Sequence, residues 1–261
     1  MNQKVILISI DGMRPDGFLQ CGNPFIHDLM ARSSYTLEGS SVNPSVTLPC
    51  HMSIFHSVTP DRHGVTTNTY IPMARPINGL FEQIKYAGGR SAMYYGWEPI
   101  REVSRPGSLK HAEYIWAYTT DHTDRLLTES ALRYIKKEKP DFVFLYMVET
   151  DEKGGHDNGW MTSEYLKCIY DAIDNVRQVL EEAGDEYTVI VTADHGGHDR
   201  THGTELPEDM TIPMFFMGPA FEAGKKLSGI SLIDIAPTIA DIMGVSVPQE
   251  WEGKSIVKVE R

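Results

Sequence analysis

The chain has 261 residues, of which 41% are hydrophobic, so it is long enough to bury a substantial core and is not expected to be disordered. Its formal net charge of −12 disfavours non-specific binding to nucleic acid or to an anionic membrane, because both require a basic surface. We therefore expect neither as a partner, and an anionic ligand would need local positive charge from metal ions.

The start of the chain and its cysteines indicate the compartment. The first apolar run, at 5–10, is too short for a signal-peptide core or a membrane span. The three cysteines, Cys21, Cys50 and Cys168, are far apart and odd in number, which suits a reducing compartment and gives no thiolate metal cluster. The sequence predicts a cytoplasmic protein in which histidines and carboxylates hold any metal.

Apolar runs rich in Val, Ile, Phe and Tyr predict five strands. Each run is nearly continuous, as in strands that are buried on both faces of a parallel sheet. In chain order they lie at 4–10, 91–97, 142–148, 187–193 and 214–218.

Helical spacing of apolar residues separates these strands, at 127–135 and at 166–180, the second followed by Gly184 as a C-cap. A last helix is expected to have Asp234 as N-cap and Gly244 at its end, which places Pro237 in the first turn. The alternation predicts a doubly wound α/β fold, with a mostly parallel central sheet and helices on both faces. With no linker or repeat, we expect a single domain over 1–261.

The segment 98–123 has no clean period and mixes basic and aromatic side chains, among them Arg105, Trp116 and Tyr118. Irregular segments of this length are often binding loops, so it is a possible substrate-shaping insertion. A surface excursion explains the same composition equally well.

Three predicted strands end in acids: Asp11, then Glu149 and Asp151, then Asp194. Ligands of open α/β sheets bind beyond the carboxyl ends of the strands, so these carboxylates should meet at one rim. The last acid opens a histidine-rich stretch, TADHGGHDRTHG, at 192–203. Mixed sets of carboxylates and imidazoles bind Zn²⁺ or Mn²⁺, and their number here suggests two divalent metal ions roughly 3.5–4 Å apart.

The stretch NPSVTLPCHMS suggests a nucleophile, because its pattern predicts a loop that runs into a helix with Pro49 in the first turn. Thr47 would lie at the positive end of this helix, where backbone N–H groups and the dipole favour an anion. Its hydroxyl is a weak nucleophile until a metal stabilises the alkoxide. The alternative is that Thr47 is only an N-cap.

Five motifs, in order, resemble the alkaline phosphatase superfamily, most closely its type I phosphodiesterase/nucleotide pyrophosphatase branch. They are ISIDGMRPD, NPSVTLPCH, HGVTTN, DEKGGHDNG and TADHGGHDRTHGT, and the resemblance runs from Lys4 to about Gly244. It implies an alkaline phosphatase-like fold with two zinc ions at the C-terminal ends of the strands. One ion would be held by Asp151, His156 and His202, and the other by Asp11, Thr47, Asp194 and His195.

The resemblance also implies a mechanism. Thr47 would attack phosphorus and form a covalent phosphothreonine, which metal-activated water then hydrolyses, and the Asn68 amide would bind a phosphate oxygen. The substrate would be a small phosphate ester or a nucleotide. One departure is that the spacing from Asp151 to His156 is one residue longer than usual in the family, while Glu152 has the usual spacing, so either acid could be the ligand.

These observations favour a hydrolase of phosphodiester or nucleotide pyrophosphate bonds. A phosphonate hydrolase or a phosphomonoesterase could use the same site, although a monoester needs extra positive charge that is not evident beside Thr47. A sulfatase is disfavoured, because Thr47 cannot form the aldehyde on which those enzymes depend and TLPCH lacks their arginine. The alternative from another class is a metal-binding scaffold without catalysis, which a fold resemblance alone does not exclude.

Overall fold

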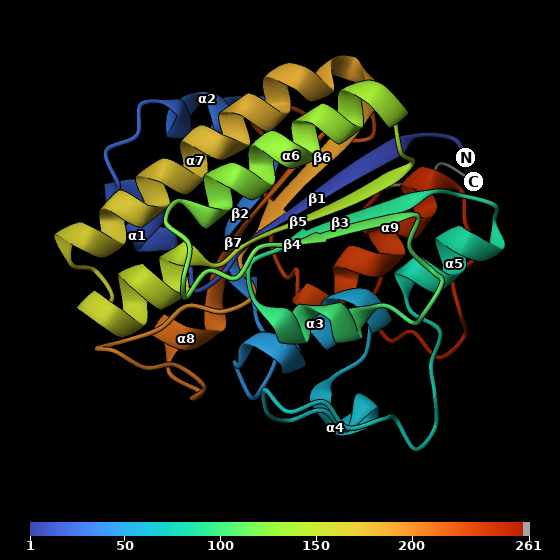
Figure 1. Cartoon of the computed structure of the whole chain (residues 1–261), viewed down its shortest axis with the longest axis horizontal. Helices are drawn as coiled ribbons and strands as arrows, with labels where there is room; N and C mark the ends of the chain where they lie inside the picture. Colours follow the sequence, from blue (N-terminus) through green and yellow to red (C-terminus); the bar gives the residue numbers. More distant parts are fainter. Residues whose placement is uncertain (258–261) are drawn as a thin grey trace.

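The computed structural model describes residues 1–257, which form a seven-stranded sheet between two layers of helices (Figure 1). The strand order is β2-β7-β6-β1-β5-β3-β4. In chain order the strands are β1 (Lys4–Ile10), β2 (Ser34–Ser40), β3 (Ser91–Tyr95), β4 (His111–Tyr114), β5 (Phe142–Met147), β6 (Tyr187–Thr192) and β7 (Thr211–Met217).

The centre of the sheet is parallel, as the continuous apolar runs predict. Strand β1 pairs in parallel with β5 on one side and β6 on the other, and β3 continues the parallel set beyond β5. Side chains of β5 and β6 are buried along their whole length, because helices cover both faces. The predicted fold class is therefore confirmed.

Strand β7 is the exception, because it runs antiparallel to both β6 and β2. The chain leaves β6 at the carboxyl end and forms a long loop and the short helix α8 (Pro207–Met210) before β7 begins. The chain thus re-enters the sheet at the same end of the strands at which β6 finished, so β7 runs in the opposite direction to β6. The apolar run at 214–218 predicts burial correctly but carries no information on direction.

Two edge strands, β2 and β4, were not predicted from the sequence. Their burial alternates along the chain, and β4 has only four residues, so neither forms a continuous apolar run. Strand β4 lies within the segment 98–123, which also contains the 3₁₀ turn η1 (Glu98–Val103). Part of this segment thus extends the sheet next to β3.

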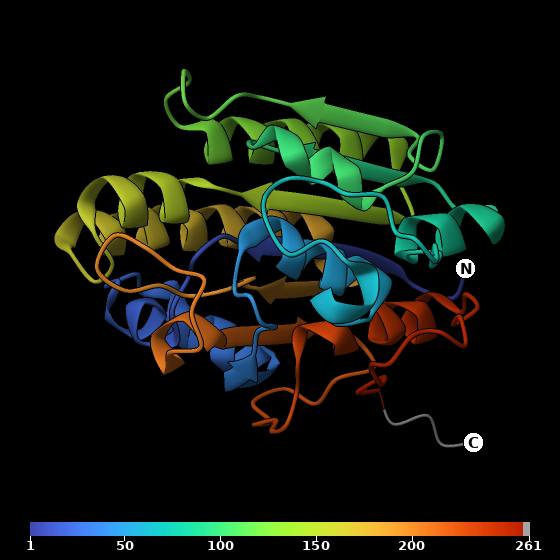
Figure 2. The ribbon, with the colours of Figure 1, turned by 90° about the horizontal axis from the view of Figure 1, so that it is seen from below.

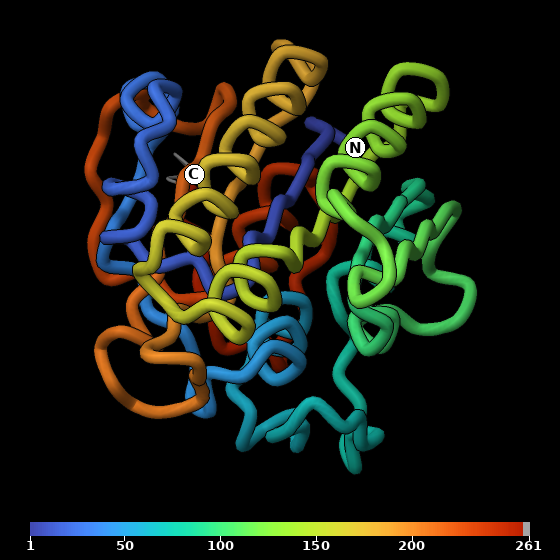
Figure 3. Tube along the Cα trace, turned by 60° about the vertical axis from the view of Figure 1, so that its left-hand side comes forward, coloured from blue at the N-terminus to red at the C-terminus, as the bar shows by residue number. Residues whose placement is uncertain are grey.

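Helices cover both faces of the sheet, as Figures 1 and 2 show. The first layer contains α1 (Pro15–Gln20), α2 (Phe25–Arg32), α6 (Thr123–Glu138) and α7 (Ser163–Ala183). The second contains α3 (Thr47–His56), α5 (Leu80–Tyr86) and α9 (Ile235–Met243). Figure 3 shows α6 and α7 side by side. Three further short helical elements are α4 (Pro60–His63), which follows α3, η3 (Gly184–Glu186), which follows α7, and η4 (Leu232–Asp234), which precedes α9.

The predicted helix ends are present. Gly184 follows α7 and Gly244 follows α9, both with positive φ angles of 51° and 69°. Asp234 precedes α9 as expected, but its carboxylate accepts a hydrogen bond from the Ser231 N–H and so stabilises the preceding turn η4. Within residues 1–257, no helix has the length and apolar character required to cross a membrane.

Candidate active site

The carboxyl ends of three adjacent strands bring the predicted acids together. Asp11 directly follows β1, Asp194 follows β6, and Asp151 lies in the turn after β5. Because β1 lies between β5 and β6, all three carboxylates meet above the centre of the sheet. Ligand atoms of Asp11, Asp194 and His195 lie within 4.8 Å of one another, as do those of Asp151, His195 and His202.

The first group forms what we call the buried half of the site: Asp11, Thr47, Asp194 and His195. The His195 Nε2 atom lies 3.2 Å from Asp11 Oδ1 and 3.4 Å from Asp194 Oδ2. Thr47 is the first residue of α3, and its Oγ1 atom lies 3.2 Å from the same His195 nitrogen. All four side chains are almost inaccessible to solvent.

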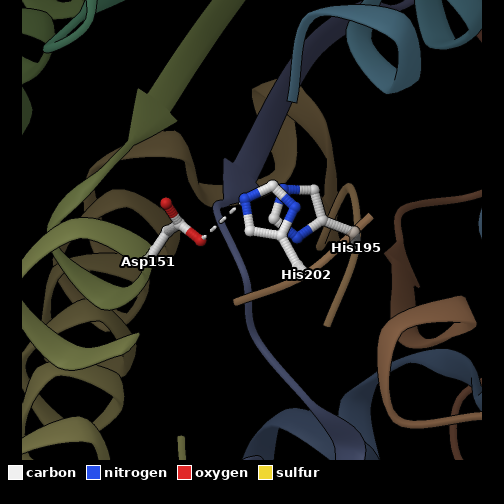
Figure 4. Close-up of side chains that lie close together, drawn as sticks. All are labelled: Asp151, His195 and His202. Carbon is white, nitrogen blue, oxygen red and sulfur yellow. Dashed lines mark ion pairs between the residues drawn. The ribbon is translucent and has the colours of Figure 1, made fainter. Parts of the chain in front are cut away.

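The second group forms the open half: Asp151, His156 and His202. The Asp151 carboxylate is 3.4 Å from His156 Nε2 and 3.9 Å from His202 Nε2. Figure 4 shows Asp151 facing the His202 ring, with His195 stacked behind it at a centroid distance of 3.9 Å. The His156 side chain is 36% exposed, so this half opens to solvent.

A π-helical turn, η2 (Thr150–Asn158), explains the unusual spacing of Asp151 and His156. In a π-helix the hydrogen bonds join residues five apart, so an inserted residue is accommodated by a wider turn. Two ligands separated by five positions can then lie on one side of the turn. The spacing from Asp151 to His156 is one residue longer than usual in the family, and the wider turn accommodates that residue.

Backbone carbonyls orient all three histidines in the same way. The Nδ1 atom of His195 donates to the Gly196 carbonyl at 2.7 Å, and that of His202 donates to the Ser45 carbonyl at 2.9 Å. His156 Nδ1 donates to the Arg200 carbonyl at 3.0 Å. Each ring thus keeps Nε2 without a proton and directed at the acids, which is the arrangement expected of a metal ligand.

Three carboxylate oxygens support the same conclusion. Asp11 Oδ1, Asp151 Oδ1 and Asp194 Oδ2 are buried and have no hydrogen-bond partner within the described part of the chain. Unpaired buried acceptors are costly, because water no longer solvates them. Oxygen and imidazole nitrogen are the ligands of Zn²⁺ and Mn²⁺, so this set fits divalent cations that would satisfy the oxygens.

The ionisation of the acids reflects this crowding. Burial raises the pKa of Asp11 well above its ordinary value, and the charges of Asp194 and Asp151 raise it further. Burial and the neighbouring Asp194 likewise raise the pKa of Asp151. Burial also disfavours ionisation of Asp194, but His195 and the other donors around it hold its pKa below the usual range. Two of the three acids thus resist ionisation without a cation.

His202 is suited to bind a metal near neutral pH. Burial lowers its pKa to about 3, and the neighbouring His195 adds to this effect. The ring is therefore neutral over the physiological range, and no proton competes for its Nε2 atom.

Asn68 lies beside the proposed nucleophile. Its Oδ1 atom accepts a hydrogen bond of 3.0 Å from the Leu48 N–H, one residue after Thr47. This bond places the amide group at the N-terminus of α3, where the helix dipole favours an anion.

Glu152 and His198 lie apart from the two ligand groups. Glu152 Oε2 accepts a hydrogen bond of 3.0 Å from the Tyr118 hydroxyl, while the Asp151 carboxylate faces the histidines. His198 Nδ1 lies 2.8 Å from Asp209 Oδ1, so it fixes the loop that carries Asp194 and His202.

Two aromatic residues of the site were missed by the sequence analysis. The Tyr146 hydroxyl donates to Asp11 Oδ2. Trp160 Nε1 donates to the Gly12 carbonyl at 3.0 Å, and its ring packs against His156 and His202. In the sequence both resemble ordinary core aromatics, so the only signal is indirect: the Gly pairs in DEKGGH and DHGGH. A Cβ atom at Gly197 would lie 2.2 Å from the Trp160 ring.

Comparisons with known proteins confirm the resemblance seen in the motifs. A family model described as type I phosphodiesterase / nucleotide pyrophosphatase matches residues 5–209. The 2,3-bisphosphoglycerate-independent phosphoglycerate mutase of Clostridioides difficile (strain 630) is 28% identical over 137 residues, covering 50% of this chain and 26% of that protein. Ectonucleotide pyrophosphatase/phosphodiesterase family member 1 of Mus musculus is 24% identical over 218 residues, covering 73% of this chain and 24% of that protein. The chain thus matches about a quarter of the length of these relatives.

Solved structures share the fold. An inactive variant of murine ectonucleotide pyrophosphatase / phosphodiesterase 5, in complex with AMP, superposes with a TM-score of 0.79 at 15% identity, over 94% of this chain and 96% of that chain. The phosphonate monoester hydrolase from Silicibacter pomeroyi gives a TM-score of 0.74 at 15% identity, over 97% of this chain and 76% of that chain.

Proposed function

The chain belongs to the type I phosphodiesterase/nucleotide pyrophosphatase family, a family of hydrolases, and from this premise we propose that it cleaves phosphodiester or nucleotide pyrophosphate bonds. One observation carries the proposal: the Thr47 hydroxyl, at the N-terminus of a helix, lies 3.2 Å from Nε2 of His195, where the two candidate ligand groups meet. The alternative that Thr47 is only an N-cap is wrong, because Val46 is the N-cap of α3 and Thr47 is its first residue.

Two divalent metal ions are the proposed cofactors. The buried half, Asp11, Thr47, Asp194 and His195, would hold one ion, and the open half, Asp151, His156 and His202, would hold the other. Zn²⁺ is favoured by the histidine content, and Mn²⁺ fits the same ligands. When bound, the ions would lower the pKa of the nucleophile and neutralise the charge that develops on the phosphoryl oxygens.

The protein groups would act as follows. Thr47 Oγ1 loses its proton to solvent and forms a bond to phosphorus, while the bond from phosphorus to the leaving oxygen breaks and that oxygen departs with the electron pair, which yields a phosphothreonine. The backbone N–H of Thr47, the first residue of α3, and the amide NH₂ of Asn68 stabilise the phosphoryl oxygens. Water then attacks the phosphothreonine and restores the Thr47 hydroxyl.

The charge of the site supports a diester over a monoester. Among residues 1–257, no lysine or arginine side chain is hydrogen bonded or ion paired to any of the seven proposed ligands. A dianionic monoester needs additional positive charge, whereas a diester has a single negative charge.

The segment 98–123 is proposed to shape the leaving-group side of the site. Tyr118, from this segment, contacts Glu152 in the turn that carries two open-half ligands, and Trp116 packs edge-on against Tyr118. Both aromatic rings are about half exposed. The substrate would be a small phosphate ester or a nucleotide, and the cysteine pattern favours a cytoplasmic location.

Hydrolysis of three model esters tests this proposal. The zinc-loaded protein is assayed with bis-p-nitrophenyl phosphate, p-nitrophenyl phosphate and the p-nitrophenyl ester of phenylphosphonate, with Thr47→Ala prepared in parallel to measure background. We expect the diester to be the best substrate by kcat/KM and the activity to be absent from the variant. Preference for the phosphonate or the monoester would overturn the proposed specificity. Two bound metals without turnover of any ester would support the non-catalytic scaffold.

A further inference from the structure

A buried carboxylate outside the ligand set anchors the turn that carries the open half. Asp124, the second residue of α6, is 3% exposed. Its Oδ1 atom accepts the Val148 N–H at 2.9 Å, and its Oδ2 atom accepts the Glu149 N–H at 3.0 Å. Those N–H groups lie between β5 and η2. Both carboxylate oxygens of Asp124 therefore fix the backbone at which η2 leaves the sheet.

The segment before η2 also binds the start of α6 through a carboxylate of its own. Glu149 Oε1 accepts the Thr123 N–H at 3.1 Å, and Lys153 Nζ donates to the same oxygen at 2.5 Å. Lys153 also lies 3.9 Å from Asp121. We call Asp124, Glu149 and Lys153 the clamp. It joins the start of α6 to both ends of the first π-helical turn, and Asp151 lies between Glu149 and Lys153.

From this arrangement we propose that Asp124 is a positioning residue for the open half, acting through η2 on Asp151 and His156. π-helical turns are rare and occur frequently at functional sites, so the contacts that hold η2 are expected to affect the two side chains it carries into the site. When a group that orients a metal ligand without binding the metal itself is removed, the metal affinity typically falls about 10–100-fold.

The rest of the site has a different anchor. The loop with Asp194, His195 and His202 is fixed by Asp209, whose carboxylate accepts from His198 Nδ1 at 2.8 Å and from the Thr204 N–H at 2.9 Å. Asp11 directly follows a central strand. The clamp therefore reaches only the ligands on η2, and its loss should weaken one metal ion while sparing the other.

The experiment measures metal affinity directly and needs no substrate. Zinc binding to the full chain is titrated against a competing chelator for the wild type, Asp124→Asn and the matched control Asp141→Asn. The titration is made above pH 8, because burial raises the pKa of Asp124 to about 8 and the ionised carboxylate is the form that accepts both N–H groups. Asp141 also accepts a backbone N–H, that of Arg90 at 2.8 Å, but it lies before β5 at the opposite end of the sheet. We expect Asp124→Asn to weaken the weaker of the two zinc sites by about 10-fold or more, with the other site and the control unchanged.

A double-mutant cycle identifies the affected ion. In a His202→Ala background the open half is already impaired, so Asp124→Asn should have little further effect on the zinc that remains. Equal weakening of both sites by Asp124→Asn, or a lowered Tm with both affinities intact, would show a role in folding only and would overturn the inference.

A second, milder variant keeps the test decisive if Asp124→Asn does not fold. Glu149→Gln retains an acceptor for the Thr123 N–H but loses the charge that holds Lys153, and we expect a smaller loss at the same zinc site. An unchanged affinity in both folded variants would contradict the role of the clamp. The inference rests on the proposed metal centre and not on the reaction: a wild type that binds two zinc ions without hydrolysing esters would refute the proposed function alone.

Discussion

The two halves of the candidate metal centre differ in how much regular structure carries them. In the buried half, Asp11 directly follows β1 and Thr47 begins α3, while Asp194 and His195 lie in the loop after β6. The open half comes from irregular backbone, the π-helical turn η2 and the loop around His202. The backbone hydrogen bonds of a strand or helix fix the positions of side chains such as Asp11 and Thr47. Side chains on a loop or on η2 depend instead on individual hydrogen bonds from residues such as Asp124 and Asp209.

The difference in solvent access has a consequence for metal exchange. Asp11, Asp194 and His195 are at most 1% exposed, while the His156 side chain is 36% exposed. A chelator can reach a cation in the open half without local unfolding, but the buried half must open first. We therefore expect the open-half ion to exchange faster and to bind less strongly.

The largest effect should follow from a change in the buried half. Asp194→Asn removes the charge of an acid whose Oδ2 atom has no hydrogen-bond partner in residues 1–257. We expect loss of the buried-half ion and a fall in kcat/KM of more than about 100-fold. This exceeds the loss of about 10–100-fold that is typical when a group that only orients a metal ligand is removed. Metal analysis and turnover of the variant measure this. Asp199→Asn, an exposed neighbour in the same loop, is the matched control and should behave as wild type.

A change in the open half should have a smaller effect that excess metal can reverse. His156→Ala removes the most exposed ligand, so we expect a weakened open-half ion and a turnover that recovers as the zinc concentration rises. Titration of activity with zinc tests this. If turnover stays low at saturating zinc, the two halves do not differ in the way their burial indicates.

The stability of the metal-free protein should depend on pH. Burial raises the pKa of Asp11 and Asp151, so the folded state retains protons that the unfolded chain releases near pH 3.9. This stabilisation is complete at low pH and is lost as the pH rises through the raised values. Above about pH 6.5, His202 is neutral in both states, because burial lowers its folded pKa to about 3, and does not oppose this trend. The Tm of the chelator-treated protein should therefore fall as the pH rises through the raised pKa values of Asp11 and Asp151.

An asparagine variant isolates the contribution of the site. Burial also raises the pKa of Asp124 to about 8, which adds a slope of the same sign. Metal-free Asp11→Asn should show a shallower fall of Tm with pH than the metal-free wild type, while zinc should stabilise the wild type most at the higher pH values. Equal slopes in the two proteins would contradict the role assigned to Asp11.

The smallest effect is expected from a substitution of Glu152. Comparison with the same substitution of Asp151 tests which of the two acids binds the metal. Because Glu152 contacts the Tyr118 hydroxyl, Glu152→Gln should retain both ions and lose at most several-fold in kcat/KM. Asp151→Asn, prepared beside it, should lose the open-half ion. The reverse outcome would assign the ligand role to Glu152.

The sequence predicted the buried half more completely than the open half, for a physical reason. A buried parallel strand is a continuous apolar run, and the acid that ends it is visible by inspection, so Asp11 and Asp194 could be placed at one rim. The family resemblance then associated Thr47 with them. Strand direction is not encoded in apolarity, which is why the reversal of β7 was not foreseen.

The remaining features depend on tertiary contacts that leave no local pattern. The π-helical turn was seen only as a spacing anomaly between Asp151 and His156. Tyr146 and Trp160 resemble core residues until their hydrogen bonds to Asp11 and to the Gly12 loop are known. Asp124 resembles an ordinary acid in the first turn of a helix, and only the fold shows that it contacts the turn after β5.

The most direct test of the account is detection of a phosphate on Thr47. Turnover of a diester by the zinc-loaded protein is quenched with acid, and the peptide that contains Thr47 is analysed by mass spectrometry with fragmentation. The account predicts one phosphoryl group on Thr47 in the wild type, none in Thr47→Ala, and a fall in kcat of about 10³-fold or more in that variant with both ions retained. A wild type that turns over without phosphate on Thr47, together with an active Thr47→Ala, would contradict it.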